Sequence, residues 1–291
     1  MDENHYRATR RRASLVAPGS DERKARKALS SCADEVILDL EDAVTSSNKD
    51  LARTLVSSLV LEFGGARTIS VRINGLTTPW ARDDLIACGS LEESLTSVIV
   101  PKVESADELL EAEHILFTAG GNHTTLQALI ETPLGVQNAD SIARATPRLQ
   151  AAIIGYADLG AALGRSRSAL PEHWLAIQDR ILIACRAAGV AAIDGPFLGI
   201  TDDDAFRHAA HWTSALGFDG KWVIHPAQID SATIAFTPSD DAVRDARRVL
   251  TALEEAENLG SGAAQLDGQM LDEAVAVAAR RTLARAEGVT V

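Results

Sequence analysis

The stretch VILDLEDAV, residues 36–44, begins as an apolar run and ends on three carboxylates within four residues: Asp39, Glu41 and Asp42. Carboxylates buried without partners would be strongly destabilising. They are tolerated where a buried strand leaves the core and meets a wet cavity with cations close by. We therefore expect a strand that ends at such a cavity, with Arg72 and Lys102 of the next two apolar runs as the candidate cations.

Seven further β-rich runs resemble this one in length, and helical segments such as 105–117 and 172–189 alternate with them. Near-continuous apolar strands that alternate with helices predict a parallel sheet covered by helices, and eight of them fit a closed (β/α)8 TIM barrel. A doubly wound open sheet is the alternative, but the turn after the first run lacks G-x-G-x-x-G. The eight runs are 13–19, 35–41, 68–74, 97–104, 126–132, 151–159, 191–196 and 221–226.

More than one closing helix follows the eighth run. Residues 239–258 and 271–287 have helical periodicity, and a Gly-rich break at 259–269 separates them. We predict a barrel catalytic domain over residues 1–236 and a C-terminal helical extension over 237–291. The extension would act as a lid or an arm that reaches a neighbouring subunit, or would pack as a helix on its own barrel.

Composition narrows the class of protein. The chain has 291 residues, a formal net charge of −13 and a pI near 5.0, which opposes nucleic-acid binding because phosphate requires clustered Lys and Arg. No apolar run is long enough to span a bilayer. Three cysteines far apart, without C-x-x-C spacing, favour a reduced, cytoplasmic protein.

Acidic side chains end two neighbouring runs. Glu131 ends the fifth and Asp158 the sixth. Because side chains at the carboxyl ends of barrel strands converge at the mouth, where active sites of this architecture lie, these two carboxylates can meet at one point. Hard oxygen ligands suit Mg²⁺, with positions left for water and a chelating substrate. Salt bridges to neighbouring cations are the alternative.

The motifs taken together resemble the citrate lyase β-subunit-like family, which includes malyl-CoA and citramalyl-CoA lyases and lies beside the HpcH/HpaI aldolases. The resemblance extends over nearly the whole chain. It is carried by VAPGSDERKARKAL, ADEVILDLEDAV, SVRINGLTTPWARDDL, VPKVESADEL, ALIETPLGVQNADSIA, GYADLGAALG, ALGFDGKWVIHPAQI and LDGQMLDEA.

This resemblance implies a set of site residues. Mg²⁺ would be held by Glu131 and Asp158, so that Glu131 also faces the substrate. Arg72 would act in catalysis by contacting the substrate carboxylate or carbonyl oxygen, and Asp272 matches the catalytic carboxylate of the acyl-CoA lyases. The resemblance also places Glu41 and Asp42 near metal-bound waters; an ion-pair network with Arg72 and Lys102 is the alternative.

The activity that the resemblance implies is reversible, Mg²⁺-dependent cleavage of a hydroxyacyl-CoA thioester to an acyl-CoA and a 2-oxo acid. It further implies a homotrimer or hexamer in which the C-terminal segment covers a neighbour's active site. Three alternatives stay open. They are a citrate lyase β subunit acting on citryl-acyl carrier protein, a CoA-independent pyruvate-type aldolase, and a catalytically silent oligomeric protein.

Overall fold

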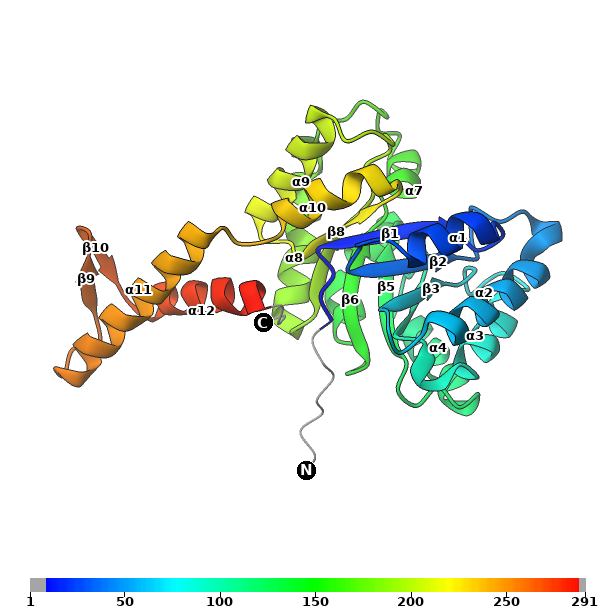
Figure 1. Cartoon of the computed structure of the whole chain (residues 1–291), viewed down its shortest axis with the longest axis horizontal. Helices are drawn as coiled ribbons and strands as arrows, with labels where there is room; N and C mark the ends of the chain where they lie inside the picture. The colour runs from blue at the N-terminus through cyan, green and yellow to red at the C-terminus, as the bar shows by residue number, and fades with distance from the viewer. Residues whose placement is uncertain (1–8, 288–291) are drawn as a thin grey trace. The chain divides into compact units, whose positions relative to one another are not determined.

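The computed structural model describes residues 9–287, and the chain divides into two compact units. One comprises Arg11–Phe236, and the other contains the chain from Thr237 onward. The first unit is a closed barrel in which eight parallel strands follow one another in chain order (Figure 1). Pairing of Ala13 in β1 with Lys221 in β8 closes it. The predicted TIM barrel is confirmed, and the open-sheet alternative is wrong.

The strands are short and the helices between them lie on the outside of the barrel (Figure 1). The strands are β1 Ala13–Pro18, β2 Glu35–Asp39, β3 Ile69–Arg72, β4 Ser97–Val100, β5 Thr125–Ile130, β6 Leu149–Ile154, β7 Ala191–Asp194 and β8 Gly220–Val223. The α-helices are α1 Glu22–Leu29, α2 Lys49–Phe63, α3 Ala81–Gly89, α4 Ala106–Thr118, α5 Pro133–Gln137, α6 Ala139–Ala143, α7 Tyr156–Ala162, α8 Leu175–Ala188, α9 Asp204–Leu216 and α10 Ile229–Ala235. Short 3₁₀ helices are η1 Ser46–Asn48, η2 Glu92–Ser94, η3 Pro171–Trp174 and η4 Pro226–Gln228.

Local sequence signals place the ends of these helices. Ser105 begins α4 with a capping box, because its hydroxyl accepts from the Glu108 amide while the Glu108 carboxylate accepts from the Ser105 amide. Gly189 ends α8 with φ 69°, a left-handed conformation that glycine adopts without a steric cost. The helices thus begin and end where the chain must return to the next strand.

The barrel interior has three layers, which β2 illustrates. Because side chains alternate along a strand, Glu35, Ile37 and Asp39 share one face. At the amino end, Glu35 is fully buried and accepts hydrogen bonds from Arg11 Nε at 3.0 Å and Gln127 Nε2 at 2.8 Å. Ile37 belongs to an apolar middle layer. The third layer, at the carboxyl end, is polar and carries the candidate site.

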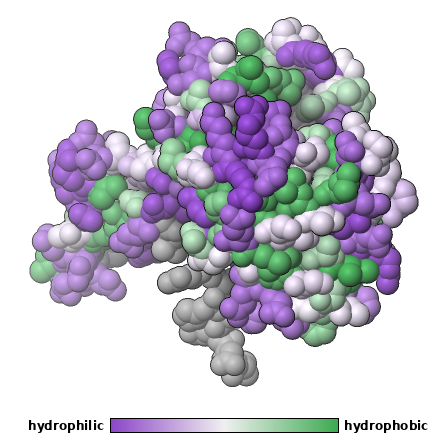
Figure 2. Space-filling view, turned by 45° about the vertical axis from the view of Figure 1, so that its right-hand side comes forward, coloured by the Kyte–Doolittle hydropathy of each residue, from purple (hydrophilic) through white to green (hydrophobic). Residues whose placement is uncertain are grey.

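The surface of the protein mixes polar and apolar side chains. On the face that Figure 2 shows, hydrophilic residues lie between smaller hydrophobic areas. Isolated exposed apolar side chains such as Leu51 and Ile183 are ordinary for a globular protein. Over residues 9–287, every helix is too short or too polar to cross a membrane.

The C-terminal unit is built from two helices and a hairpin: α11 Asp240–Asn258, β9 Ala264–Leu266, β10 Gln269–Leu271 and α12 Glu273–Glu287. The predicted C-terminal helical extension is confirmed. The predicted Gly-rich break between the two helices is also present, and the segment within it folds as an antiparallel hairpin that the sequence analysis did not predict. Asp267 and Gly268 both have positive φ, 48° and 79°, which is the turn geometry that joins two strands directly.

Candidate active site

The register between β2 and β3 determines the orientation of Arg72. Asp39 lies directly opposite Arg72. Arg72 donates to both Asp39 oxygens, from Nε at 2.7 Å and from Nη2 at 2.6 Å. Asp39 also accepts from the amides of Glu41 and Ala43, so it closes the turn after β2. The sequence placed Asp39 near the cations of the mouth but gave it no role in the site. Its place directly opposite Arg72 follows from strand pairing, which the sequence does not display.

Glu41 and Asp42 lie beside two cations. Glu41 is buried, and its carboxylate oxygens lie 2.9 Å from Arg72 Nη1 and 2.5 Å from Lys102 Nζ. The Asp42 side chain is 61% exposed and stays 3.8 Å and 3.9 Å from the same two groups. The prediction that Arg72 and Lys102 neutralise the carboxylates of residues 36–44 is confirmed.

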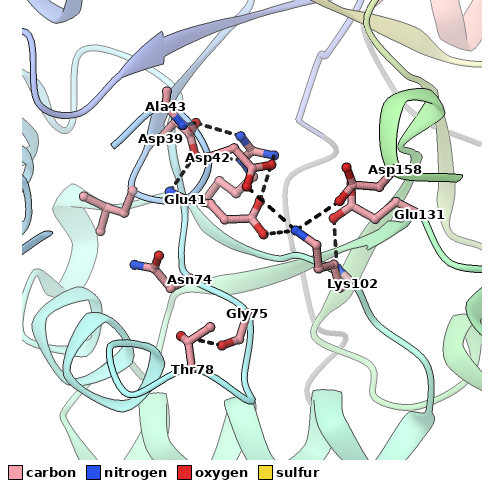
Figure 3. Close-up of polar contacts among 12 residues, drawn as sticks. Asp39, Glu41, Asp42, Ala43, Asn74, Gly75, Thr78, Lys102, Glu131 and Asp158 are labelled. Atoms are coloured by element: carbon pink, nitrogen blue, oxygen red, sulfur yellow. Dashed lines mark hydrogen bonds and ion pairs between the residues drawn. The ribbon is translucent and has the colours of Figure 1, made fainter. Parts of the chain in front are cut away.

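Glu131 and Asp158 reach the same mouth from different elements (Figure 3). Glu131 directly follows β5, is buried, and accepts from the backbone amide of Lys102 at 3.1 Å. Asp158 lies 3.1 Å from Lys102 Nζ through its Oδ2. The prediction that Asp158 ends the sixth strand is wrong. β6 ends at Ile154, and Asp158 belongs to the first turn of α7, because the chain turns into a helix at Gly155.

Gly155 leaves the space that the Glu131 side chain occupies. A Cβ atom at position 155 would lie 2.4 Å from both Cβ and Oε2 of Glu131. Any larger residue would therefore push the carboxylate away from its present position. The glycine that begins α7 thus positions an acid on the neighbouring strand.

The electrostatics of the mouth favour an added cation. The pKa of Glu131 is raised to about 8, because burial and, after it, the Glu41 carboxylate outweigh the lowering effects of Lys102 and Arg72. Burial also raises the pKa of Glu41. For Lys102, burial lowers the pKa, but the hydrogen bond to Glu41 and the negative charges of Glu41 and Glu131 together outweigh burial, so the net pKa is raised. A buried carboxyl group that holds its proton at neutral pH, as Glu131 does, indicates that its surroundings are short of positive charge.

The residues at the mouth fit Mg²⁺. Within residues 9–287, no three His, Cys, Asp or Glu side chains are grouped closely enough to hold a metal by themselves. Glu131 and Asp158 instead offer a pair of hard oxygen donors, which would leave other positions for water and substrate. The Lys102 ammonium beside Asp158 shows that positive charge is already accommodated next to this pair.

A cavity of about 400 Å³ opens beside Glu41 and Lys102. Its polar wall includes Asn74, which the buried Asp84 holds by accepting from the Asn74 side-chain amide at 2.6 Å. The remaining lining comes mainly from the turns after β2 and β3: Asp42, Val44, Thr45, Ser46, Lys49, Gly75, Leu76, Thr77, Thr78 and Trp80, with Pro101 and Glu108. Its size falls within the range of small-molecule sites.

Asp272 lies in the C-terminal unit, whereas the barrel brings the five other predicted residues together. It directly follows β10 and is exposed. Its Oδ1 accepts from the amides of Ala274 at 3.0 Å and Val275 at 3.3 Å, so the carboxylate caps the first turn of α12.

This protein has a closed parallel barrel with paired carboxylates and cations at the carboxyl ends of its strands. That is the arrangement of a TIM-barrel enzyme. The model of the family described as HpcH/HpaI aldolase/citrate lyase matches residues 12–226. The chain belongs to this family, as the sequence motifs indicated.

Two curated proteins and one crystal structure illustrate what the chain is similar to. An L-malyl-CoA/beta-methylmalyl-CoA lyase of Rhodobacter capsulatus is 36% identical over 290 residues, which cover 90% of each chain. A (3S)-malyl-CoA thioesterase of Cereibacter sphaeroides is 39% identical over 282 residues, covering 96% of this chain and 95% of the relative. The crystal structure of CitE from Mycobacterium tuberculosis with magnesium, acetoacetate and coenzyme A has a TM-score of 0.77 at 32% identity, covering 97% and 99% of the two chains.

Proposed function

We propose that this protein is a Mg²⁺-dependent carbon–carbon lyase that cleaves a hydroxyacyl-CoA thioester, of the malyl-CoA or citramalyl-CoA type, to an acyl-CoA and a 2-oxo acid. The convergence of Glu131 and Asp158 on Lys102 at the barrel mouth, with Arg72 linked to Lys102 through Glu41, carries the proposal. Membership of the aldolase/citrate lyase family supports it. So do the similar malyl-CoA lyases and the CitE structure with magnesium and coenzyme A.

Cleavage makes defined demands on the site. The hydroxyl proton leaves, the bond between the hydroxyl-bearing carbon and the thioester α-carbon breaks, and its electron pair passes to the α-carbon and the thioester carbonyl. The α-carbon then takes up a proton, which completes the acyl-CoA. Glu131 and Asp158 would hold Mg²⁺, which when bound would polarise the hydroxyl or 2-oxo oxygen.

Arg72 would stabilise the carboxylate of the 2-oxo acid. An arginine has five N–H donors. Asp39 engages two of those of Arg72 and Glu41 lies beside Nη1, so one N–H each on Nη1 and Nη2 stays available for a substrate oxygen. Because Asp39 already fixes the guanidinium plane, little reorganisation is needed when charge develops. Glu41 and Asp42 would orient the metal-bound water and the neighbouring cations.

Asp272 would supply the proton to the α-carbon in cleavage and remove it in condensation. In this proposal residues 1–236 form the catalytic domain, and residues 237–291 form an arm or lid that brings Asp272 to the mouth of a barrel within a trimer or hexamer. Exposure of Asp272 in the C-terminal unit supports this role. The proposed location of the enzyme is the cytoplasm.

Hydrolysis of the same thioester is the second candidate function. It is favoured by the malyl-CoA thioesterase, which matches 96% of this chain at 39% identity, whereas the lyase matches 90% at 36%. In hydrolysis, water attacks the thioester carbonyl and the CoA thiol leaves, with the carbon–carbon bond intact.

One incubation separates lyase from thioesterase. The protein is mixed with (S)-malyl-CoA and Mg²⁺, and glyoxylate, acetyl-CoA and free thiol are measured together. A lyase releases glyoxylate and acetyl-CoA without free thiol, and a thioesterase releases malate and free thiol without glyoxylate. Glu131→Gln and Asp158→Asn should abolish either activity. Asp272→Asn should slow the proton transfer while Mg²⁺ binding is kept; absence of any turnover by the wild type on malyl-CoA and citramalyl-CoA would refute the proposal.

A further inference from the structure

The Lys102 ammonium lies between carboxylates that come from different elements (Figure 3). Nζ is 2.5 Å from Glu41 Oε1, after β2, and 3.1 Å from Asp158 Oδ2, on α7. A third carboxylate, that of Asp42, is 3.9 Å away. The side chain therefore bridges the Arg72 side of the mouth and the side that carries the proposed metal ligands.

The backbone of Lys102 has an uncommon conformation that serves the same arrangement. Its φ is 54°, in the left-handed region that long side chains rarely adopt. In this turn after β4 the amide donates to Glu131 Oε1 while the side chain reaches Glu41 and Asp158. An outlier of this kind persists when its surroundings hold it, and such outliers gather at functional sites.

The charges of the mouth favour a third cation besides Arg72 and Lys102. Two cations, Arg72 and Lys102, are in contact with four carboxylates: Asp39, Glu41, Asp42 and Asp158. A fifth carboxylate, that of Glu131, accepts a hydrogen bond from the Lys102 backbone amide. Asp39 and Glu41 both contact Arg72, whereas Asp158 contacts Lys102. A divalent ion between Glu131 and Asp158 would therefore compete with Lys102 for Asp158.

We propose that Lys102 is a tethered counter-ion for the metal-free site: its ammonium neutralises Asp158, and Mg²⁺ must displace it from Asp158 while it stays paired with Glu41. This inference rests on the proposed Mg²⁺ site at Glu131 and Asp158. Lys102 is thus a positioning residue that sets how tightly the metal binds and offsets the repulsion between the carboxylates when the metal is absent.

The exchange has a measurable consequence. An ion pair whose two side chains are 40% and 38% exposed contributes modestly, so its removal should strengthen Mg²⁺ binding by about two- to fivefold. Lys102→Met keeps the length of the side chain and removes the charge. We expect a lower unfolding temperature than wild type in EDTA, and a difference that shrinks at saturating Mg²⁺, because the metal then neutralises the carboxylates in both proteins.

Two further variants separate displacement from a general change of charge. Lys27→Met removes an exposed lysine on α1 and should leave the Mg²⁺ dissociation constant unchanged. Lys102→Arg keeps the charge but can hold Asp158 through two N–H groups, so it should bind Mg²⁺ more weakly than wild type. If only the overall field mattered, Lys102→Arg would match wild type and Lys27→Met would also bind Mg²⁺ more tightly.

The measurements are calorimetric titration of Mg²⁺ and thermal unfolding in EDTA and in Mg²⁺, neither of which requires turnover. Equal Mg²⁺ affinity in wild type and Lys102→Met would overturn the inference. So would a crystal structure with Mg²⁺ in which Nζ still lies within 4 Å of Asp158. Failure of the proposed Mg²⁺ site would give a different result. In that case wild type would bind no Mg²⁺, or the Glu131→Gln and Asp158→Asn variants would bind it as tightly as wild type. If Lys102→Met does not fold, Lys102→Arg decides.

Discussion

Gly155→Ala tests whether the placement of the Glu131 carboxylate determines metal binding. The new Cβ would lie 2.4 Å from Cβ and Oε2 of Glu131. Because carbon atoms pack at about 3.5 Å, the two groups must separate by roughly 1 Å. Gly155 has φ −100°, which alanine adopts readily, so the conflict is with the Glu131 side chain and not with the backbone conformation.

The magnitude follows in two parts. Overpacking of this kind should lower the free energy of unfolding by about 1–3 kcal/mol. A displacement of the Glu131 carboxylate by about 1 Å should weaken Mg²⁺ binding by roughly 100-fold, the loss typical of a group misplaced by that distance in an active site. With Mg²⁺ at about 100 times the wild-type dissociation constant, wild type gains about 2.7 kcal/mol of stability from the metal, whereas a variant with 100-fold weaker binding gains only about 0.4 kcal/mol.

The assay is urea unfolding of wild type and Gly155→Ala with and without Mg²⁺, together with calorimetric titration of the metal. Gly160→Ala is the matched control, because it lies on the same helix and its Cβ would meet Trp174 at an ordinary 3.4 Å. This control should keep both stability and Mg²⁺ affinity. If Gly155→Ala bound Mg²⁺ within about twofold of wild type, Glu131 would not be the ligand that we infer.

Three further substitutions probe separate parts of the barrel. The native state raises the pKa of Glu131 from 4.5 to about 8 and so favours its protonated form; the stability of the metal-free protein should therefore fall as pH rises through this interval. Glu131→Gln should flatten that fall, measured by thermal unfolding in EDTA. An unchanged slope would contradict the assignment. Glu35→Ala removes the carboxylate that pairs with the buried Arg11 and should lower the free energy of unfolding by about 3–5 kcal/mol, measured in urea. Glu35→Gln should lower it less. A loss below about 1 kcal/mol for Glu35→Ala would argue against the buried network. Asp39→Asn weakens the fork that orients Arg72 and should lower kcat by about tenfold or more while the unfolding temperature changes little; wild-type kcat would show that Arg72 needs no such support.

Much of the barrel follows from local pattern. The apolar runs predicted eight strands, and the acid that ends the fifth run, Glu131, indeed lies at the mouth. Asp158 was assigned to the correct end of the barrel but to the wrong element, since an apolar run followed by Gly155 does not reveal where a strand becomes a helix. The hairpin at Asp267 and Gly268 was missed because its strands are only three residues each.

The sequence by itself determined which side chains would face the mouth, because the alternation of a strand and the position at its end are local properties. Only the tertiary structure decided which of them meet. The pairing of Asp39 with Arg72 depends on the register of two strands, and the bridge that Lys102 makes from Glu41 to Asp158 depends on closure of the barrel and on a left-handed turn. Contacts between residues far apart in the chain arise from packing of the whole barrel, which no single segment encodes.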